Sequence, residues 1–353
     1  MNTIATTMRA MRLHEGSGGS AELRLDDDVP IPQPGPGEVL IAVKACGLNQ
    51  VDLLTRDGET PAEVPLPHIS GTEVAGDIVA VADDVGDWAA GDAVVVDPII
   101  TCGKCAACHR GDTNMCHTSR VFGVQTHGGY AEYATVPARQ LFRLPKSLSY
   151  AEAAAIAVTG PTAWHMLRRR ADLRVGEDVL IIAAGSGIGV LGIQIAKLAG
   201  ARVIATAGSE EKLQHALELG ADFAVNHRED GWAKTARGFT GGRGVDVVFE
   251  HVGEATWAGS LQALARGGRL VTCGGHSGFE VGINLWHLFV KEQTLIGSFA
   301  GTKQDFLDIM ALADKSDMRQ VVQEIVPLND IPRAQQMLRD RQVFGKLIVD
   351  PTL

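Results

Sequence analysis

Hydrophobic and polar positions follow two different patterns along this chain of 353 residues. Between about residues 160 and 298, short apolar runs alternate with amphipathic segments, which is typical of parallel strands connected by helices. We expect strands at Val179–Ala183, Arg202–Thr206, Phe223–Val225, Val245–Phe249, Arg269–Cys273 and Thr294–Gly297, and a helix at Ser209–Leu219. This part of the chain is therefore predicted to be an α/β domain with a doubly wound parallel sheet.

The residues before and after this region have a different pattern. Up to about Thr159 the sequence indicates strands and irregular turns, with strands expected at Glu38–Ala45 and Asp77–Val81. After about Phe299 the pattern predicts two helices and a last strand, at Lys303–Ala313, Ile331–Arg339 and Lys346–Asp350. These segments predict a second, strand-rich structure outside the α/β domain.

The stretch Asp178–Gly200 contains a candidate dinucleotide site. A buried strand is followed by Gly185, then by Gly187-x-Gly189-x-x-Gly192, and then by a helix expected at Val190–Leu198. In the dinucleotide-binding turn, the first glycine allows the tight turn, the second lets the backbone approach the pyrophosphate and the third lets helix and strand pack. A glycine-rich buried turn without a ligand is the alternative. A membrane span is not expected, because the apolar stretch is too short.

Composition narrows the class of protein. The net charge of −10 is spread along the chain, which argues against nucleic acid as the main partner and predicts an anionic surface. The expected partner is a small-molecule substrate. The first residues contain no apolar run of signal-peptide length, so we expect a cytoplasmic protein without membrane association. In that compartment the six cysteines are not expected to form disulfides.

Cysteines cluster in one short segment. The spacing Cys102-x2-Cys105-x2-Cys108-x7-Cys116 is typical of a closed four-thiolate site, which holds one structural Zn²⁺. An iron–sulfur cluster is disfavoured because no proline follows the last cysteine, and a redox dithiol pair is the remaining alternative. Cys46 and Cys273 stand apart and are expected to be small buried residues.

Taken together, these motifs resemble the medium-chain dehydrogenase/reductase superfamily. The resemblance rests on PQPGPGEVL, the four-cysteine segment, GGYAEY, the glycine-rich turn and Gly345-Lys346, and it covers nearly the whole chain. It implies a Rossmann domain at 160–298, inserted into a GroES-like catalytic domain that carries the structural zinc and is formed by residues 1–159 and 299–353.

The resemblance also indicates that a catalytic zinc site has been lost. Zinc-dependent alcohol dehydrogenases of the superfamily have Gly-x-Cys-x-x-Asp, then Gly-His-Glu, then a third ligand. This chain has Asn49, Thr72 and Val158 at those positions, and GLNQVD resembles the GxNxxD stretch of the quinone reductases. Asn, Thr and Val do not provide a zinc site. A displaced site made by Cys46, His68 and Glu73 is the alternative.

The expected reaction follows from this difference. Without a Lewis acid, hydride transfer to an activated C=C bond or a quinone is easier than alcohol oxidation. We expect Asn49 to donate a hydrogen bond to the substrate carbonyl, Asp52 to orient the loop and Arg56 to be a further contact. His127 is a second candidate contact, whereas Tyr130 is expected to pack. Leu54 replaces a tyrosine common in quinone reductases, which leaves solvent water as a proton donor.

The cofactor is expected to be NADPH, with NADH as the alternative. An NAD site has an acid at the tip of the second strand, whereas this chain has Ala207-Gly208-Ser209 there. Ser209 and Lys212 match residues that hold the 2′-phosphate in NADPH-dependent reductases, and His227 replaces a tyrosine. The resemblance places further residues near the nucleotide, namely Thr162, Gly185, Ile188, Val252, Gly274 and Lys346, and His251 is expected near the nicotinamide.

The sequence is also compatible with two other functions. The first is an alcohol dehydrogenase with a non-standard metal site, and the second is a non-catalytic NADPH-binding protein. Metal content separates the first from a zinc-free reductase, and NADPH turnover separates both enzymes from the binding protein. We also expect a homodimer or homotetramer, built by pairing of the edge strand Thr294–Gly297.

Overall fold

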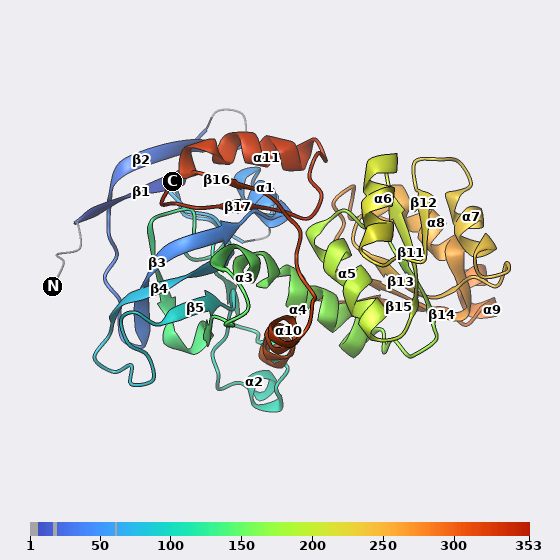
Figure 1. Ribbon diagram of the computed structural model, residues 1–353, viewed down its shortest axis with the longest axis horizontal. Helices are drawn as coiled ribbons and strands as arrows, with labels where there is room; N and C mark the ends of the chain where they lie inside the picture. The colour runs from blue at the N-terminus through green and yellow to red at the C-terminus, as the bar shows by residue number, and fades with distance from the viewer. Residues whose placement is uncertain (1–5, 17–19, 61) are drawn as a thin grey trace. The chain divides into compact units, whose positions relative to one another are not determined.

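The computed structural model describes residues 6–16, 20–60 and 62–353. The chain forms two compact units (Figure 1). One comprises Met1–Val158 and Thr302–Leu353, and the other comprises Thr159–Gly301. The first unit therefore contains both ends of the chain, and the second is a continuous insertion between them.

In its described residues, the first unit is built on a seven-stranded sheet with the order β16-β17-β3-β4-β5-β9, in which β8 also pairs with β3. The pairs are antiparallel except β16–β17. The strands are β3 (Glu38–Gly47), β4 (Glu73–Val81), β5 (Ala93–Val96), β8 (Tyr133–Pro137), β9 (Leu141–Arg143), β16 (Val322–Val326) and β17 (Lys346–Val349). Two smaller pairs are β1 (Thr7–His14) with β2 (Glu22–Pro30), and β6 (Ile99–Ile100) with β7 (Arg120–Val121).

The apolar side chains of these strands form the core of the first unit. Val39, Ile41 and Val43 of β3 pack with Val74 and Ile78 of β4 in one buried cluster. The helices of this unit are α1 (Gln50–Arg56), α2 (Ala106–Arg110), α3 (Tyr150–Ile156), α10 (Lys303–Lys315) and α11 (Ile331–Arg339), with short 3₁₀ turns at Thr113–Met115, Ala138–Gln140 and Leu328–Asp330. The predicted helix Ile331–Arg339 is confirmed, and α10 runs two residues beyond its predicted end.

The second unit contains a six-stranded parallel sheet among its described residues, with the order β12-β11-β10-β13-β14-β15. Its strands are β10 (Asp178–Ile181), β11 (Arg202–Ala207), β12 (Phe223–Asn226), β13 (Val245–Glu250), β14 (Leu264–Thr272) and β15 (Thr294–Gly297). This order is that of a dinucleotide-binding doubly wound sheet, so the predicted fold class is confirmed. β14 begins earlier than predicted because Leu264 pairs with Val245 before the register shifts.

Helices connect these strands. They are α4 (Thr159–Trp164), which continues as a π-helical segment at His165–Arg170, α5 (Gly187–Leu198), α6 (Glu210–Glu218), α7 (Trp232–Gly238), α8 (Glu254–Ala263) and α9 (Leu285–Val290). α5 begins three residues before its predicted start, because Ser186 caps it by accepting a hydrogen bond from the Gly189 N–H. No helix in the described part of the chain is long and apolar enough to cross a membrane.

Candidate active site, cofactor site and metal centre

A buried cluster of polar side chains forms where β3, β4 and β17 meet in the first unit. Lys346, the first residue of β17, has its Nζ 2.7 Å from a carboxylate oxygen of Glu73, the first residue of β4. The same ammonium donates to Asn49 Oδ1 at 2.8 Å, and Asn49 Nδ2 donates to Thr72 Oγ1 at 3.1 Å. The Val158 N–H donates to Glu73 Oε1 at 3.0 Å. Positions 49, 72 and 158 are thus brought together.

Strand pairing explains this convergence. The end of β3 lies between β4 and β17, with Gly47 opposite Glu73 on one side and Ile348 on the other. The backbone N–H of Leu48 then donates to the carbonyl of Leu347 at 3.0 Å. A Cβ on Gly47 would lie only 2.1 Å from the Glu73 carboxylate, so glycine is needed at this crossing.

The Lys346–Glu73 pair is excluded from solvent. Lys346 is 3% exposed and Glu73 is fully buried. Burial raises the pKa of Glu73, and this effect is opposed by the Lys346 ammonium, the Val158 N–H and the Asn49 side chain. Because a buried charge is costly without its partner, we expect loss of either side chain alone to destabilise the fold.

Asp52 connects this cluster to Tyr130. Its Oδ2 accepts a hydrogen bond from the Asn49 N–H at 2.7 Å and one from Tyr130 Oη at 2.6 Å. Burial raises the pKa of Asp52 to about 6, against the effect of these two donors. Asp52 therefore holds the first turn of α1, and the fully buried Tyr130 packs in the core, as its sequence context predicted.

Arg56 and His127 form hydrogen bonds outside this cluster. Arg56 Nη1 donates to Gln335 Oε1 at 3.1 Å, and its side chain lines a cavity of about 390 Å³. His127 Nδ1 accepts from the Ile69 N–H at 3.2 Å. These hydrogen bonds connect the two side chains to other loops and helices of the first unit.

The cluster does not fit a catalytic zinc. Asn49, Thr72 and Val158 provide a carboxamide, a hydroxyl and an alkyl group, whereas zinc sites use thiolate, imidazole or carboxylate ligands. The one carboxylate of the cluster, Glu73, is paired with the Lys346 ammonium. The alternative set of Cys46, His68 and Glu73 is not assembled either. His68 is buried with Nε2 3.2 Å from the Gly123 carbonyl, and burial lowers its pKa to about 4.

The four clustered cysteines do form a site that fits a metal. The Sγ atoms of Cys102, Cys105, Cys108 and Cys116 all lie within 4.8 Å of one another, in the segment that contains α2. The Cys105–Cys108 and Cys102–Cys116 sulfurs are 3.5 and 3.6 Å apart. Tetrahedral zinc with Zn–S bonds of about 2.3 Å would hold sulfurs about 3.8 Å apart. Among the described residues, this is the only group of three or more His, Cys, Asp or Glu side chains that close together.

The glycine-rich turn leads from β10 into α5, as predicted, but its glycines act differently. Gly187 is the first residue of α5, and the left-handed position is Ala183, with φ of 50°. A Cβ on Gly189 would lie 2.6 Å from the Ala183 carbonyl oxygen, so Gly189 allows the close approach of α5 to the turn that precedes it. A Cβ on Gly192 would meet only ordinary contacts at 3.5 Å or more. Gly185 lies in the turn and Ile188 in the first turn of α5.

The tips of β11 and β12 carry the candidate 2′-phosphate residues. Ser209 caps α6 by accepting from the Lys212 N–H at 3.5 Å. His227 Nδ1 lies 3.0 Å from Thr206 Oγ1, which ties the two strand tips together. Arg228, which follows His227, also lies here and was not anticipated from the sequence. The available signal in the sequence was a basic residue a few positions after the end of the predicted strand Phe223–Val225.

The remaining candidates are distributed along both units. Val252 and Gly274 follow β13 and β14, and Thr162 lies buried on α4. Lys346 belongs to the first unit, where its ammonium contacts oxygens of Leu48, Asn49 and Glu73. His251, expected near the nicotinamide, is buried with Nε2 2.9 Å from the Ile182 carbonyl, and burial lowers its pKa to about 3. The neutral imidazole therefore forms a hydrogen bond with the backbone of the glycine-rich turn.

Comparison with known proteins agrees with this architecture. The zinc-binding dehydrogenase family matches residues 187–315, and the alcohol dehydrogenase GroES-like domain matches residues 35–146. An NAD-dependent alcohol dehydrogenase of Sulfolobus acidocaldarius is 33% identical, over 98% of this chain and 100% of its own length. Human quinone oxidoreductase is 30% identical, over 99% of both chains.

Solved structures of alcohol dehydrogenases share the fold of this chain. The crystal structure of an NAD-dependent alcohol dehydrogenase has a TM-score of 0.93 and 41% identity, covering 97% of this chain and 99% of that one. A cobalt- and zinc-bound alcohol dehydrogenase from Pyrobaculum aerophilum has a TM-score of 0.87 and 34% identity, covering 98% and 99%. The chain belongs to the medium-chain dehydrogenase/reductase superfamily. It is a nicotinamide-dependent oxidoreductase of that type.

Proposed function

We propose that this protein is an NADPH-dependent reductase that transfers hydride to an activated C=C bond or a quinone without a catalytic zinc. The observation that carries the proposal is the Lys346 ammonium bonded to Asn49 and Glu73, beside Thr72 and Val158. A positive charge and neutral side chains stand where an alcohol dehydrogenase of this superfamily would need metal ligands. The similarity to human quinone oxidoreductase supports the same reading.

The donor groups suit reduction of a conjugated carbonyl compound. NADPH supplies the hydride, and negative charge then develops on the substrate oxygen, where hydrogen-bond donors are most effective. We assign this role to the Asn49 carboxamide and to the Thr72 hydroxyl, which accepts from Asn49 and can donate its own proton. Lys346 and Asp52 position Asn49 through its Oδ1 and its N–H.

The preference for NADPH rests on the tip of β11. Thr206-Ala207-Gly208-Ser209 contains no carboxylate to accept hydrogen bonds from the ribose hydroxyls of NADH. We propose that Ser209, Lys212 and His227 line the 2′-phosphate site. NADH remains the weaker alternative cofactor.

A second candidate is an alcohol dehydrogenase with a non-standard metal site. It is favoured by the 41% identity to a structurally characterised NAD-dependent alcohol dehydrogenase. Metal content distinguishes the two proposals, because a catalytic metal would have to be bound in addition to the one held by the four cysteines.

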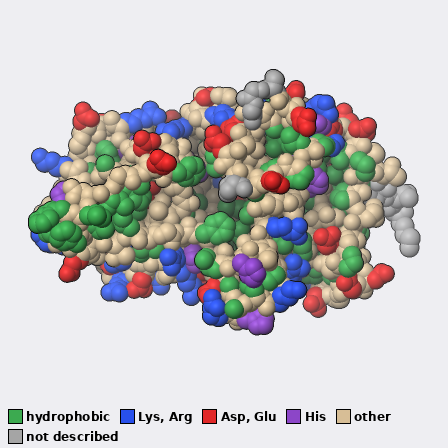
Figure 2. Space-filling model, turned by 180° about the vertical axis from the view of Figure 1, so that it is seen from behind, with side chains coloured by type: hydrophobic (Ala, Val, Ile, Leu, Met, Phe, Trp, Pro, Cys, Tyr) green, Lys and Arg blue, Asp and Glu red, His purple; other side chains and the backbone are tan. Residues whose placement is uncertain are grey.

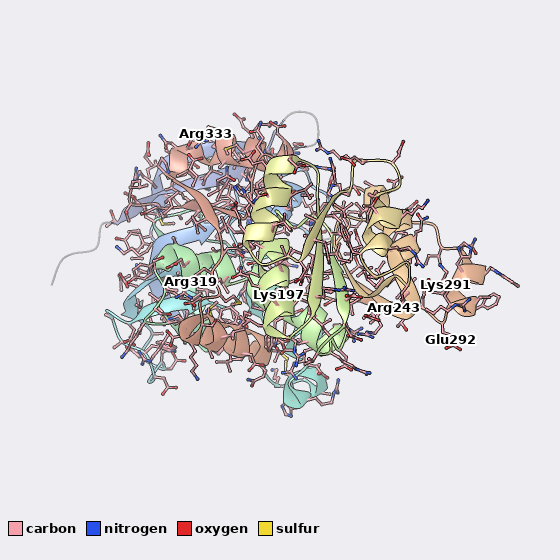
Figure 3. The ribbon with its side chains drawn as sticks, turned by 45° about the vertical axis from the view of Figure 1, so that its right-hand side comes forward. Lys197, Arg243, Lys291, Glu292, Arg319 and Arg333 are labelled. Carbon is pink, nitrogen blue, oxygen red and sulfur yellow. The ribbon has the colours of Figure 1, made fainter. Side chains whose placement is uncertain are left out.

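We also propose a homodimer built on the second unit. β15 is the last strand in the order of the sheet, and α9 exposes Leu285, Trp286 and Phe289 by 68, 66 and 59%. Figure 2 shows apolar side chains gathered on this unit, and Figure 3 labels Lys291 and Glu292, which connect α9 to β15. An exposed sheet edge beside an apolar helix is suited to symmetric pairing with a second copy. A homotetramer would require a second interface.

The test combines turnover with metal analysis of the purified protein. NADPH consumption is measured with quinones, enones, enals and enoyl thioesters, and NADP⁺ reduction is measured with primary and secondary alcohols. We expect turnover with at least one conjugated acceptor and one zinc per chain. Alcohol oxidation that depends on a second bound metal would refute the proposal, and binding of NADPH without any turnover would favour a binding protein.

A further inference from the structure

Arg228 lies directly over Gly208, at the tips of two neighbouring parallel strands. Gly208 follows β11, and Arg228 follows β12 after His227. A Cβ on Gly208 would lie 2.7 Å from Arg228 Nε and 3.2 Å from its Cζ. The absence of a side chain at position 208 therefore makes room for the guanidinium at the tip of β11.

The backbone that carries Arg228 is held in place. Its N–H donates to Asn226 Oδ1 at 3.0 Å, and the N–H of His227 donates to the Ala207 carbonyl at 3.0 Å. His227 Nδ1 is bonded to Thr206 Oγ1 as well. These bonds fix the start of the Arg228 side chain relative to β11, so that only the side chain itself has freedom to reorient.

The guanidinium has no carboxylate partner among the residues that the structure describes. Arg228 is exposed, whereas Arg202 and Arg243 of the same unit are paired with Asp178. Carboxylates do occur nearby in sequence, at Glu210 and Glu211 on α6 and at Glu229 and Asp230 after Arg228, but none forms an ion pair with it. A planar group with several donors is thus left available to an anion.

We propose that Arg228 is the main ligand of the adenosine 2′-phosphate and determines the preference for NADPH over NADH. The proposal deepens the proposed function and rests on it for the identity of the cofactor. In a doubly wound sheet, the nucleotide lies beyond the carboxyl ends of the strands, and the adenosine ribose lies at the tip of the second strand. The guanidinium over Gly208 occupies this place, and it can bind two phosphate oxygens at once. The Ser209 hydroxyl is adjacent in sequence.

Binding of nucleotide fragments tests the role of Arg228 without any turnover. Affinities for 2′,5′-ADP and 5′-AMP are measured by calorimetry for the full-length protein, for Arg228→Gln and for Arg266→Gln. Arg266 is a matched control because it is exposed in the same unit and its Nη1 bonds to the Val290 carbonyl. We expect Arg228→Gln to weaken 2′,5′-ADP binding about 10- to 100-fold, which is the effect of losing one charged hydrogen-bonding partner.

The control ligand separates a local effect from misfolding. The affinity for 5′-AMP is expected to stay within about twofold of the parent value in both variants, because 5′-AMP lacks the 2′-phosphate that Arg228 is proposed to bind. If the parent protein prefers 2′,5′-ADP to 5′-AMP and Arg228→Gln binds 2′,5′-ADP as tightly as the parent, the role of Arg228 is wrong but the NADPH preference stands. A parent protein that binds 5′-AMP as tightly as 2′,5′-ADP would overturn the NADPH preference as well. Neither result depends on which acceptor is reduced.

Discussion

Lys346 Nζ and a carboxylate oxygen of Glu73 lie 2.7 Å apart in the interior of the first unit, although they come from the two separate chain segments that form this unit. The same ammonium also contacts Asn49 Oδ1 and the Leu48 carbonyl. The candidate active site is therefore built around a buried ion pair, and this arrangement leads to the first two predictions.

Replacing Lys346 with Met should destabilise the protein strongly. The substitution leaves Glu73 buried without its counter-charge, which typically costs about 3–5 kcal/mol in the free energy of unfolding. The double variant Lys346→Met/Glu73→Gln removes both charges and should recover part of this loss. Urea unfolding measures both effects. A single variant as stable as the parent would show that the ion pair does not contribute to the fold.

Replacing Asn49 with Ala should lower kcat with an identified acceptor by about 100-fold, the usual effect of losing a donor to a developing oxyanion. The Michaelis constant for NADPH should change less than twofold, because position 49 lies in the first unit and not in the glycine-rich turn. Asn329→Ala, at an exposed position, is the matched control. Equal kcat in Asn49→Ala and the parent would limit Asn49 to a structural role.

Metal analysis should find one zinc per chain, bound by the four clustered cysteines. Cys105→Ser should lose most of this zinc and lower the unfolding midpoint, since a closed four-thiolate site orders its own loop. Cys273→Ser should retain the zinc, because Cys273 lies outside the cluster. Binding of 5′-AMP should persist in Cys105→Ser. Two tightly bound zincs in the parent protein would contradict the zinc-free site.

The homodimer should dissociate when charge is introduced on α9. Trp286→Asp places a carboxylate on the exposed apolar face that we assign to the interface. Leu198→Asp is the control, because Leu198 is exposed on α5 of the same unit. Sedimentation velocity at micromolar concentration should show a dimer for the parent and for Leu198→Asp, and a monomer for Trp286→Asp. A parent that sediments as a monomer would refute this interface.

The contribution of His251 to stability should fall as the pH is lowered from about 6.5 towards 3. Burial lowers the pKa of His251 to about 3, so in this interval the unfolded chain binds the proton and the folded protein does not. The stability that the neutral His251 maintains above pH 6.5 is thus lost progressively on acidification. Asp52, whose pKa is raised to about 6, acts in the opposite direction between its ordinary value and 6.

A variant isolates the histidine contribution to this pH dependence. His251→Gln should make the slope of unfolding free energy against pH less positive between 3 and 6.5, because it removes the contribution of this histidine, while the exposed His287→Gln should leave the slope as in the parent. Urea midpoints at several pH values give these slopes. Identical slopes in His251→Gln and the parent would mean that His251 is not the titrating group.

The local features of this protein were determined by the sequence alone. Strand β15 and helix α11 have their predicted bounds, because apolar periodicity and capping residues act over a few neighbouring positions. The four cysteines meet as expected, since their spacings are short enough for one loop to close on an ion. The alternation of strands and helices also predicted a parallel sheet, and the six strands of the second unit form one.

Only the tertiary structure decided which distant residues meet. Nothing in the sequence indicated that Lys346 meets Asn49 and Glu73, and it is the pairing of β17 with β3 that brings its ammonium to them. Arg228 reaches the tip of β11 because β12 is the parallel neighbour of that strand. Such contacts depend on strand register and on the packing of residues far apart in the chain, and a local pattern of hydrophobic and polar positions contains no information about either.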